Sequence, residues 1–136
     1  MTRNRATFPW ATVGAISAGI AVILGAVGSH ALRSKLGDDS LRAWTIGTDY
    51  QLAHGLALLY LDHLQHRATT DSRRIFPVGI FFSAGIILFC GSLYGLALTN
   101  WSFLGPITPF GGICFILGWC LLAQRTWAAY RKERTP

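Results

Sequence analysis

Two histidines are the residues of this sequence whose type and position most readily suggest chemistry. His30 follows directly on an apolar run, and His54 lies inside the next one. An imidazole can bind a haem iron or another metal, and it can pass protons near neutral pH. Because a titratable side chain within an apolar segment is costly, each histidine is a candidate site residue.

Polar neighbours could support the two imidazoles. The candidate polar site comprises His30 and His54 together with five residues that could bond to them: Asp49, Tyr50, Gln51, Ser92 and Tyr94. Two interpretations stay open. In one, the histidines bind a ligand, protons, a metal or haem b. In the other, they form hydrogen bonds that hold the outer loop onto the rest of the protein.

Other potential ligands form weaker patterns. Asp62 and His66 are spaced to pair along one helix face, but with His63 they lie beside Arg67, which favours a solvated interface over a metal site. The three cysteines lie in apolar runs and are expected to be small buried side chains: Cys90, Cys114 and Cys120. We therefore expect no cofactor and no catalysis, with haem or metal at the two histidines as the alternative.

Composition points to a membrane as the medium that positions these residues. The chain has 136 residues, of which 51% are hydrophobic and 13% charged, too few polar residues to cover a soluble core of that apolar content. Its charges gather near the ends and in one linker. This pattern is typical of a protein facing anionic lipid and does not indicate nucleic-acid binding.

The apolar pattern predicts an all-α membrane protein built as a four-transmembrane-helix bundle. Spans are expected at about residues 10–29, 48–66, 75–98 and 108–127, with an interfacial amphipathic stretch at about 38–48. They form a single domain over residues 10–127, between basic tails at 1–9 and 128–136. The first apolar run is longer than that of a usual signal peptide, so we expect it to be retained.

The distribution of basic residues predicts that both termini are cytoplasmic. Positive charge concentrates in the two tails and the linker between the second and third spans: Arg3, Arg5, Arg67, Arg73, Arg74, Arg125, Arg131, Lys132 and Arg134. The opposite side carries fewer basic residues, diluted by aspartates. Trp10 and Trp127 should then lie at the inner interface, and Trp44 and Trp101 at the outer one.

Small residues four apart indicate where helices could pack. The pairs are Gly14 with Ala18, Ala15 with Gly19, and Gly91 with Gly95. Such pairs let helix backbones approach closely in a bilayer, where burial of apolar surface gives little drive for association. We expect them to serve packing inside the bundle.

Ordered sequence blocks carry a family resemblance. They are Leu24 to Leu32 (LGAVGSHAL), Tyr50 to Gly55 (YQLAHG), Cys90 to Tyr94 (CGSLY), Leu104 to Gly112 (LGPITPFGG) and the pair Gly118-Trp119. From roughly Pro9 to Ala123 the sequence resembles family 423 of the domains of unknown function, small bacterial inner-membrane proteins related to a small eukaryotic transmembrane protein. Ser29 and Gly55 depart from this pattern, in which alanine is common at both positions. The resemblance implies a four-helix protein of the bacterial inner membrane and adds no established activity.

These observations predict a multi-pass membrane protein whose partners are the lipid bilayer and other membrane proteins. We expect a non-catalytic accessory or stabilising subunit that acts through helix contacts in a larger assembly. The alternative is an outer-leaflet carrier of a ligand, protons, metal or haem at His30 and His54. The uncharged loop at residues 100–107 could cap a cavity in the second case, or dock a partner in the first.

Overall fold

The computed structural model describes residues 7–66 and 72–134, and the regular secondary structure of these residues is helical. Arg3, Arg5 and Arg67, which contribute to the predicted orientation, lie outside the described residues. In chain order the elements are α1 Trp10–Val27, the π-helical η1 Gly28–Leu32, α2 Asp38–Gln65, α3 Ser72–Gly85, the π-helical η2 Ile86–Cys90, α4 Gly91–Thr99, the 3₁₀ turn η3 Ser102–Leu104, and α5 Ile107–Arg134.

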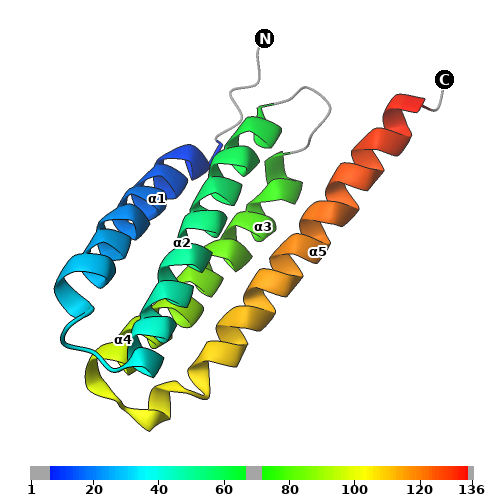
Figure 1. The fold of residues 1–136 in the computed structure, drawn as a ribbon. Helices are drawn as coiled ribbons and strands as arrows, with labels where there is room; N and C mark the ends of the chain where they lie inside the picture. The colour runs from blue at the N-terminus through cyan, green and yellow to red at the C-terminus, as the bar shows by residue number, and fades with distance from the viewer. Residues whose placement is uncertain (1–6, 67–71, 135–136) are drawn as a thin grey trace.

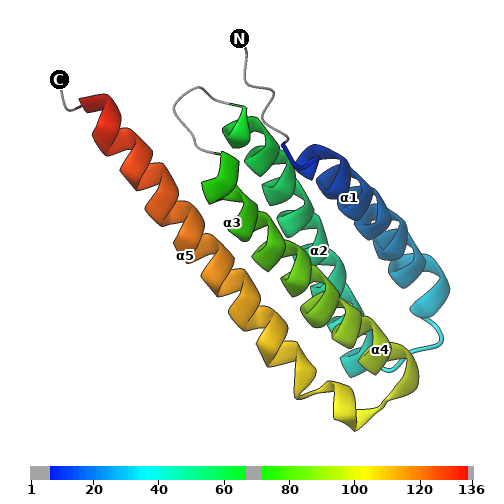
Figure 2. The ribbon, with the colours of Figure 1, turned by 180° about the vertical axis from the view of Figure 1, so that it is seen from behind.

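These elements form four long antiparallel rods. The segments α3, η2 and α4 follow one another without a break, and α1 and α5 flank α2 and this rod from opposite sides (Figures 1 and 2). The start of α1, the end of α2, the start of α3 and the end of α5 lie at one end of the bundle, which we call the terminal end. The connections from α1 to α2 and from α4 to α5 lie at the opposite end, the loop end.

Helix α2 is the central element, because it packs against α1, α3, η2 and α4. It runs unbroken for 28 residues from Asp38, a length of about 42 Å at about 1.5 Å per residue. The stretch at 38–48, predicted to be interfacial, is thus the first part of the same rod as residues 48–65. Asp38 and Asp39 lie in its first turn, where a carboxylate is favoured by the helix dipole.

Three segments are long and apolar enough to cross a membrane. They are Trp10–Leu32, Arg74–Thr99 and Ser102–Arg131, found among the described residues by length and composition. The fourth long helix, α2, does not meet these criteria over its described residues. Its carboxylates and its buried polar residues Thr48, Gln51 and His54 lower its apolar content, and its place between other helices gives those groups protein neighbours.

Glycines allow the helices to approach at short range. A Cβ atom added at Gly14 on α1 would lie 2.5 Å from the carbonyl oxygen of Gly55 on α2, and one added at Gly55 would lie 3.0 Å from the backbone nitrogen of Ala18. A Cβ added at Gly111 on α5 would collide with the backbone nitrogen of Phe89 in η2. At both crossings, backbone meets backbone with no room for a side chain.

The structure corrects two expectations about small and aromatic residues. Gly91 was expected at a helix contact, but it faces outward, with nothing within 4 Å of an added Cβ; its partner Gly95 meets the side chain of Leu104 in the adjoining connection. Trp10 was expected at the lipid interface, but it is only 1% exposed, because its indole packs on Gly79 of α3. Trp44 is likewise buried, whereas Trp101 and Trp127 are exposed.

The contact between α1 and α2 gives a first prediction. Gly14→Ala should lower the free energy of unfolding in detergent by about 1–3 kcal/mol, because its methyl group has no space against the α2 backbone. Gly19→Ala is the matched control on the same helix, since nothing lies within 4 Å of a Cβ there. If denaturant titration gives equal stabilities for the two variants, the close α1–α2 crossing is wrong.

Candidate functional site

His54 lies in the middle of α2, inside the bundle. Its side chain is 5% exposed, and its ring stacks on Phe115 of α5 with centroids 3.5 Å apart and planes 15° apart. Phe82 of α3 meets the same imidazole edge-on at 5.4 Å. The histidine therefore joins three rods through ring contacts.

Both ring nitrogens of His54 have partners within the protein. The indole nitrogen of Trp119 donates a hydrogen bond to Nε2 at 3.1 Å, and Nδ1 lies 2.8 Å from the carbonyl oxygen of Tyr50. An indole N–H can only donate, so Nε2 must accept and the proton of the neutral ring must sit on Nδ1, which donates to the carbonyl. In this state neither nitrogen is available for a metal.

A second polar cluster ties α1, α2 and α4 together. The amide nitrogen of the buried Gln51 donates to the carbonyl oxygen of Ser17 at 3.1 Å, and its amide oxygen accepts a 2.9 Å bond from the hydroxyl of Tyr94. The Tyr94 ring packs against Trp44, with centroids 4.8 Å apart. Trp44 in turn donates to the carbonyl of Leu24 at 2.8 Å. This cluster lies toward the loop end from His54.

The structure brings together some of the predicted site residues and leaves others apart. Tyr50 contacts His54 through its backbone carbonyl and its ring, whereas Gln51 and Tyr94 bond to each other in the second cluster. Ser92 is buried but pairs with Thr108 of α5, with hydroxyl oxygens 2.8 Å apart. Asp49 is exposed.

His30 does not share a site with His54, which corrects the expectation that they lie at similar depth. His30 is exposed in η1 at the loop end, whereas His54 follows the start of α2 by 16 residues, about 24 Å along the axis. The expectation failed because the apolar run beginning at Tyr50 was taken as the start of the span. The helix begins twelve residues earlier. The two imidazoles are thus not placed to be the two axial ligands of one haem.

The α5 residues that complete this site, Phe115 and Trp119, were not predicted from the sequence. Phe115 and Trp119 are four apart, as is Phe115 from Gly111, so the three share one face of α5. That spacing was a usable signal, and Trp119 also stood within the blocks that carry the family resemblance. No spacing along the chain indicated that this face would meet His54.

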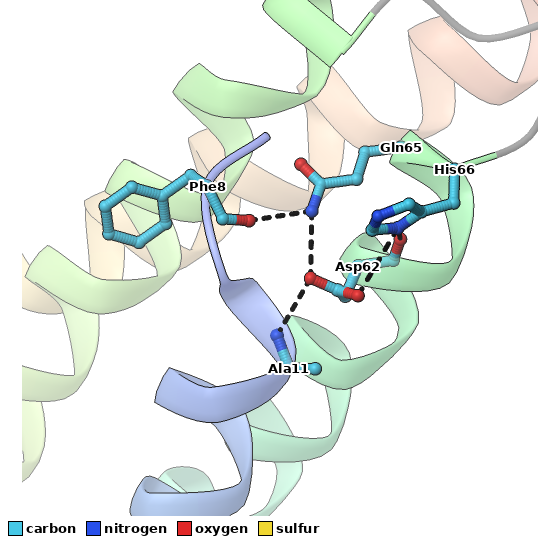
Figure 3. Close-up of polar contacts among 5 residues, drawn as sticks. All are labelled: Phe8, Ala11, Asp62, Gln65 and His66. Atoms are coloured by element: carbon cyan, nitrogen blue, oxygen red, sulfur yellow. Dashed lines mark hydrogen bonds and ion pairs between the residues drawn. The ribbon is translucent and has the colours of Figure 1, made fainter. Parts of the chain in front are cut away.

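A further polar cluster lies at the terminal end (Figure 3), and its bonds between α1 and α2 were not predicted from the sequence. The Asp62 carboxylate accepts a 3.1 Å bond from the backbone nitrogen of Ala11, in the first turn of α1, and a 2.8 Å bond from Gln65. Gln65 also donates to the carbonyl of Phe8 at 2.7 Å. Pro9, the N-cap residue of α1, makes no side-chain hydrogen bond to the start of that helix. Asp62 of α2 therefore supplies an acceptor for one of the free N–H groups in the first turn of α1.

Asp62 and His66 pair as their spacing predicted. Nδ1 of His66 lies 3.4 Å from an Asp62 carboxylate oxygen and 2.7 Å from its backbone carbonyl. His63 is exposed. Within residues 7–66 and 72–134, no three histidine, cysteine or acidic side chains are grouped as metal ligands.

The hydrogen bond between Trp119 and His54 yields the second prediction. Trp119→Phe keeps an aromatic ring but removes the N–H donor, leaving Nε2 without a partner, and should cost about 1–3 kcal/mol of unfolding free energy in detergent. Trp127→Phe, on the same helix at a side chain that is 63% exposed, should cost less than about 0.5 kcal/mol. Equal losses in the two variants would contradict the assigned bond.

Comparison with known proteins places the chain in a family. It matches the family described as "Protein of unknown function (DUF423)" over residues 24–112. A UPF0382 membrane protein of Staphylococcus aureus (strain bovine RF122 / ET3-1) is 45% identical over 114 residues, covering 84% of this chain and 91% of that protein. The UPF0382 membrane protein YwdK of Bacillus subtilis (strain 168) is 41% identical over 110 residues, covering 81% and 89%. No solved structure matches. The resemblance drawn from the sequence blocks is confirmed, and the chain belongs to the DUF423 family of membrane proteins.

Proposed function

We propose that this protein crosses the bacterial inner membrane four times, with both termini in the cytoplasm, and acts without catalysis as an accessory or stabilising subunit of a larger membrane assembly. The observation that carries the proposal is the internal pairing of the polar groups of His54 and Gln51. The ring nitrogens of His54 and the side-chain amide of Gln51 bond to groups of the same protein. This favours a scaffold whose polar core fixes its shape.

Helix lengths and charges support the four-span topology. Helix α2 is about 42 Å long and lies antiparallel to α1 and α3, which both belong to candidate spans. It should therefore cross the membrane beside them. The terminal end carries Arg74, Arg125, Arg131 and Arg134. Basic residues at the loop end share it with Asp38, Asp39 and Asp49. The rule that positive charge stays inside then assigns the terminal end to the cytoplasm.

The connection between α4 and α5 supports the role in assembly. Trp101 and Phe103 are 63% and 65% exposed at the loop end, in a stretch without charge. Two hydrogen bonds order its backbone. The backbone nitrogen of Trp101 donates to the hydroxyl of Thr99, and that of Leu104 donates to the carbonyl of Trp101. Two large aromatic side chains on an ordered turn are suited to contact another membrane protein, because aromatic residues are enriched in protein interfaces.

A ligand carrier is the second candidate, and one observation favours it. Trp119, which occupies Nε2 of His54, is 47% exposed on α5. If the indole rotated outward, a small apolar molecule with a hydrogen-bond donor, a metal or haem could reach the imidazole from the lipid side. An absorption spectrum and metal analysis of the purified protein would identify haem or metal.

Topology is tested by labelling single cysteines in intact cells. With the three native cysteines replaced by alanine, cysteines at Asp38 and Asn100 should react with a membrane-impermeant maleimide, and one at Arg131 should react only after permeabilisation. The measurement separates the proposal from a three-span arrangement in which α2 does not cross. That arrangement puts Asn100 inside and Arg131 outside, so such a labelling pattern would exclude four spans.

The assembly role is tested by native electrophoresis of a tagged chain extracted from its own membrane in mild detergent. We expect a species larger than the purified protein, and its loss in the double variant Trp101→Ala/Phe103→Ala. The control is Val22→Ala/Ile23→Ala, whose side chains on α1 are exposed to a similar degree. Identical migration of the extracted and the purified protein would contradict the proposal.

A further inference from the structure

Arg125 lies on α5 near the terminal end, where the helix leaves the apolar core. Its neighbour one turn back, Leu122, is part of that core together with Ile75 and Val78 of α3. The arginine is half-buried, and its Nε atom is shielded from solvent without a hydrogen-bond partner among the residues that the structure describes. A shielded guanidinium N–H without an acceptor is unfavourable, more so next to hydrocarbon.

Exposed aromatic residues mark the membrane boundary next to Arg125. Trp127 and Tyr130 follow it on α5, are exposed, and stack with ring centroids 5.9 Å apart. Tryptophan and tyrosine concentrate at the level of lipid headgroups. Arg125 precedes Trp127 by two residues, about 3 Å along the helix. Its charge therefore lies at or just below the depth of the lipid phosphates.

The surroundings of Arg125 are basic. Contacts of Gly111 with Phe89 and of Gly118 with Phe82 set the antiparallel register of α5 against η2 and α3. Continued toward the terminal end, that register brings Arg125 level with Ile75, next to the exposed Arg74. The carboxylate of Asp62, on α2, already accepts bonds from Ala11 and Gln65. Among the side chains that the structure describes, the charged groups at this end of α3 and α5 are arginines.

We propose that Arg125 binds the headgroup of an anionic phospholipid at the terminal end of the α3–α5 contact. A guanidinium and a phosphodiester form paired, charge-assisted hydrogen bonds, and the shielded N–H of Arg125 is a suitable donor. The excess of positive charge favours a lipid of net negative charge over a zwitterionic one. The proposal is independent of the accessory role.

Native mass spectrometry of the full-length protein in detergent tests this site. Phosphatidylglycerol and phosphatidylethanolamine with identical acyl chains are added in turn, and the bound fraction is measured. We expect retention of phosphatidylglycerol over phosphatidylethanolamine, and a loss of about tenfold in its affinity in Arg125→Gln, as for one charge-assisted hydrogen bond. Arg125→Lys should bind phosphatidylglycerol with an affinity between those of the parent and Arg125→Gln, because an ammonium lacks the paired geometry.

Arg33→Gln is the matched control, since Arg33 is an exposed arginine at the loop end. It should bind phosphatidylglycerol as the parent does. Equal retention of the two lipids by the parent, or equal losses in Arg125→Gln and Arg33→Gln, would overturn the proposal. Inorganic phosphate that competes as well as the lipid would show a site for free anions and would equally overturn it.

Discussion

A polar side chain inside a water-poor helix bundle must find its hydrogen-bond partner within the protein, and the arrangement around α2 depends on this constraint. His54, Gln51 and Asp62 project from different parts of that helix, and each is bonded to another segment: α5 through Trp119, α1 and α4 through Ser17 and Tyr94, and the start of α1 through Ala11. Apolar contacts alone would specify the packing less sharply, because lipid chains compete for them. The polar pairs fix which helix faces which.

This constraint works together with the glycine contacts. Gly14 and Gly55 bring the α1 and α2 backbones close enough for Gln51 to reach the carbonyl of Ser17, and Gly111 brings α5 close enough to η2 for Phe115 to cover the His54 ring. Close approach and polar pairing therefore occur at the same helix contacts. A bundle assembled in this way has a closely packed interior at these contacts, while its apolar outer faces remain suited to lipid.

Much of the fold could be predicted from the sequence because apolar length and charge distribution depend on local composition. The helix positions agree with the structure to within a few residues, except that α2 begins well before its apolar run and α5 ends seven residues after the predicted span. The site was predicted less completely. Tyr50, Gln51 and Tyr94 were identified by their proximity to His54 or their place in an apolar run, but pairing His30 with His54 required a depth that the sequence does not give. Trp119 could not be assigned, because the face that α5 turns toward α2 depends on the register set by Gly111 and Gly118 against α3 and η2.

The bond from Ala11 to Asp62 has a consequence for how the chain is made. The ribosome synthesises α1 before the residue that caps it, so the newly made α1 has an amide in its first turn that still lacks this acceptor. The cap forms only after α2 has been synthesised and has turned back beside α1. The final arrangement at the start of α1 therefore depends on a residue of α2 that is made 51 residues later.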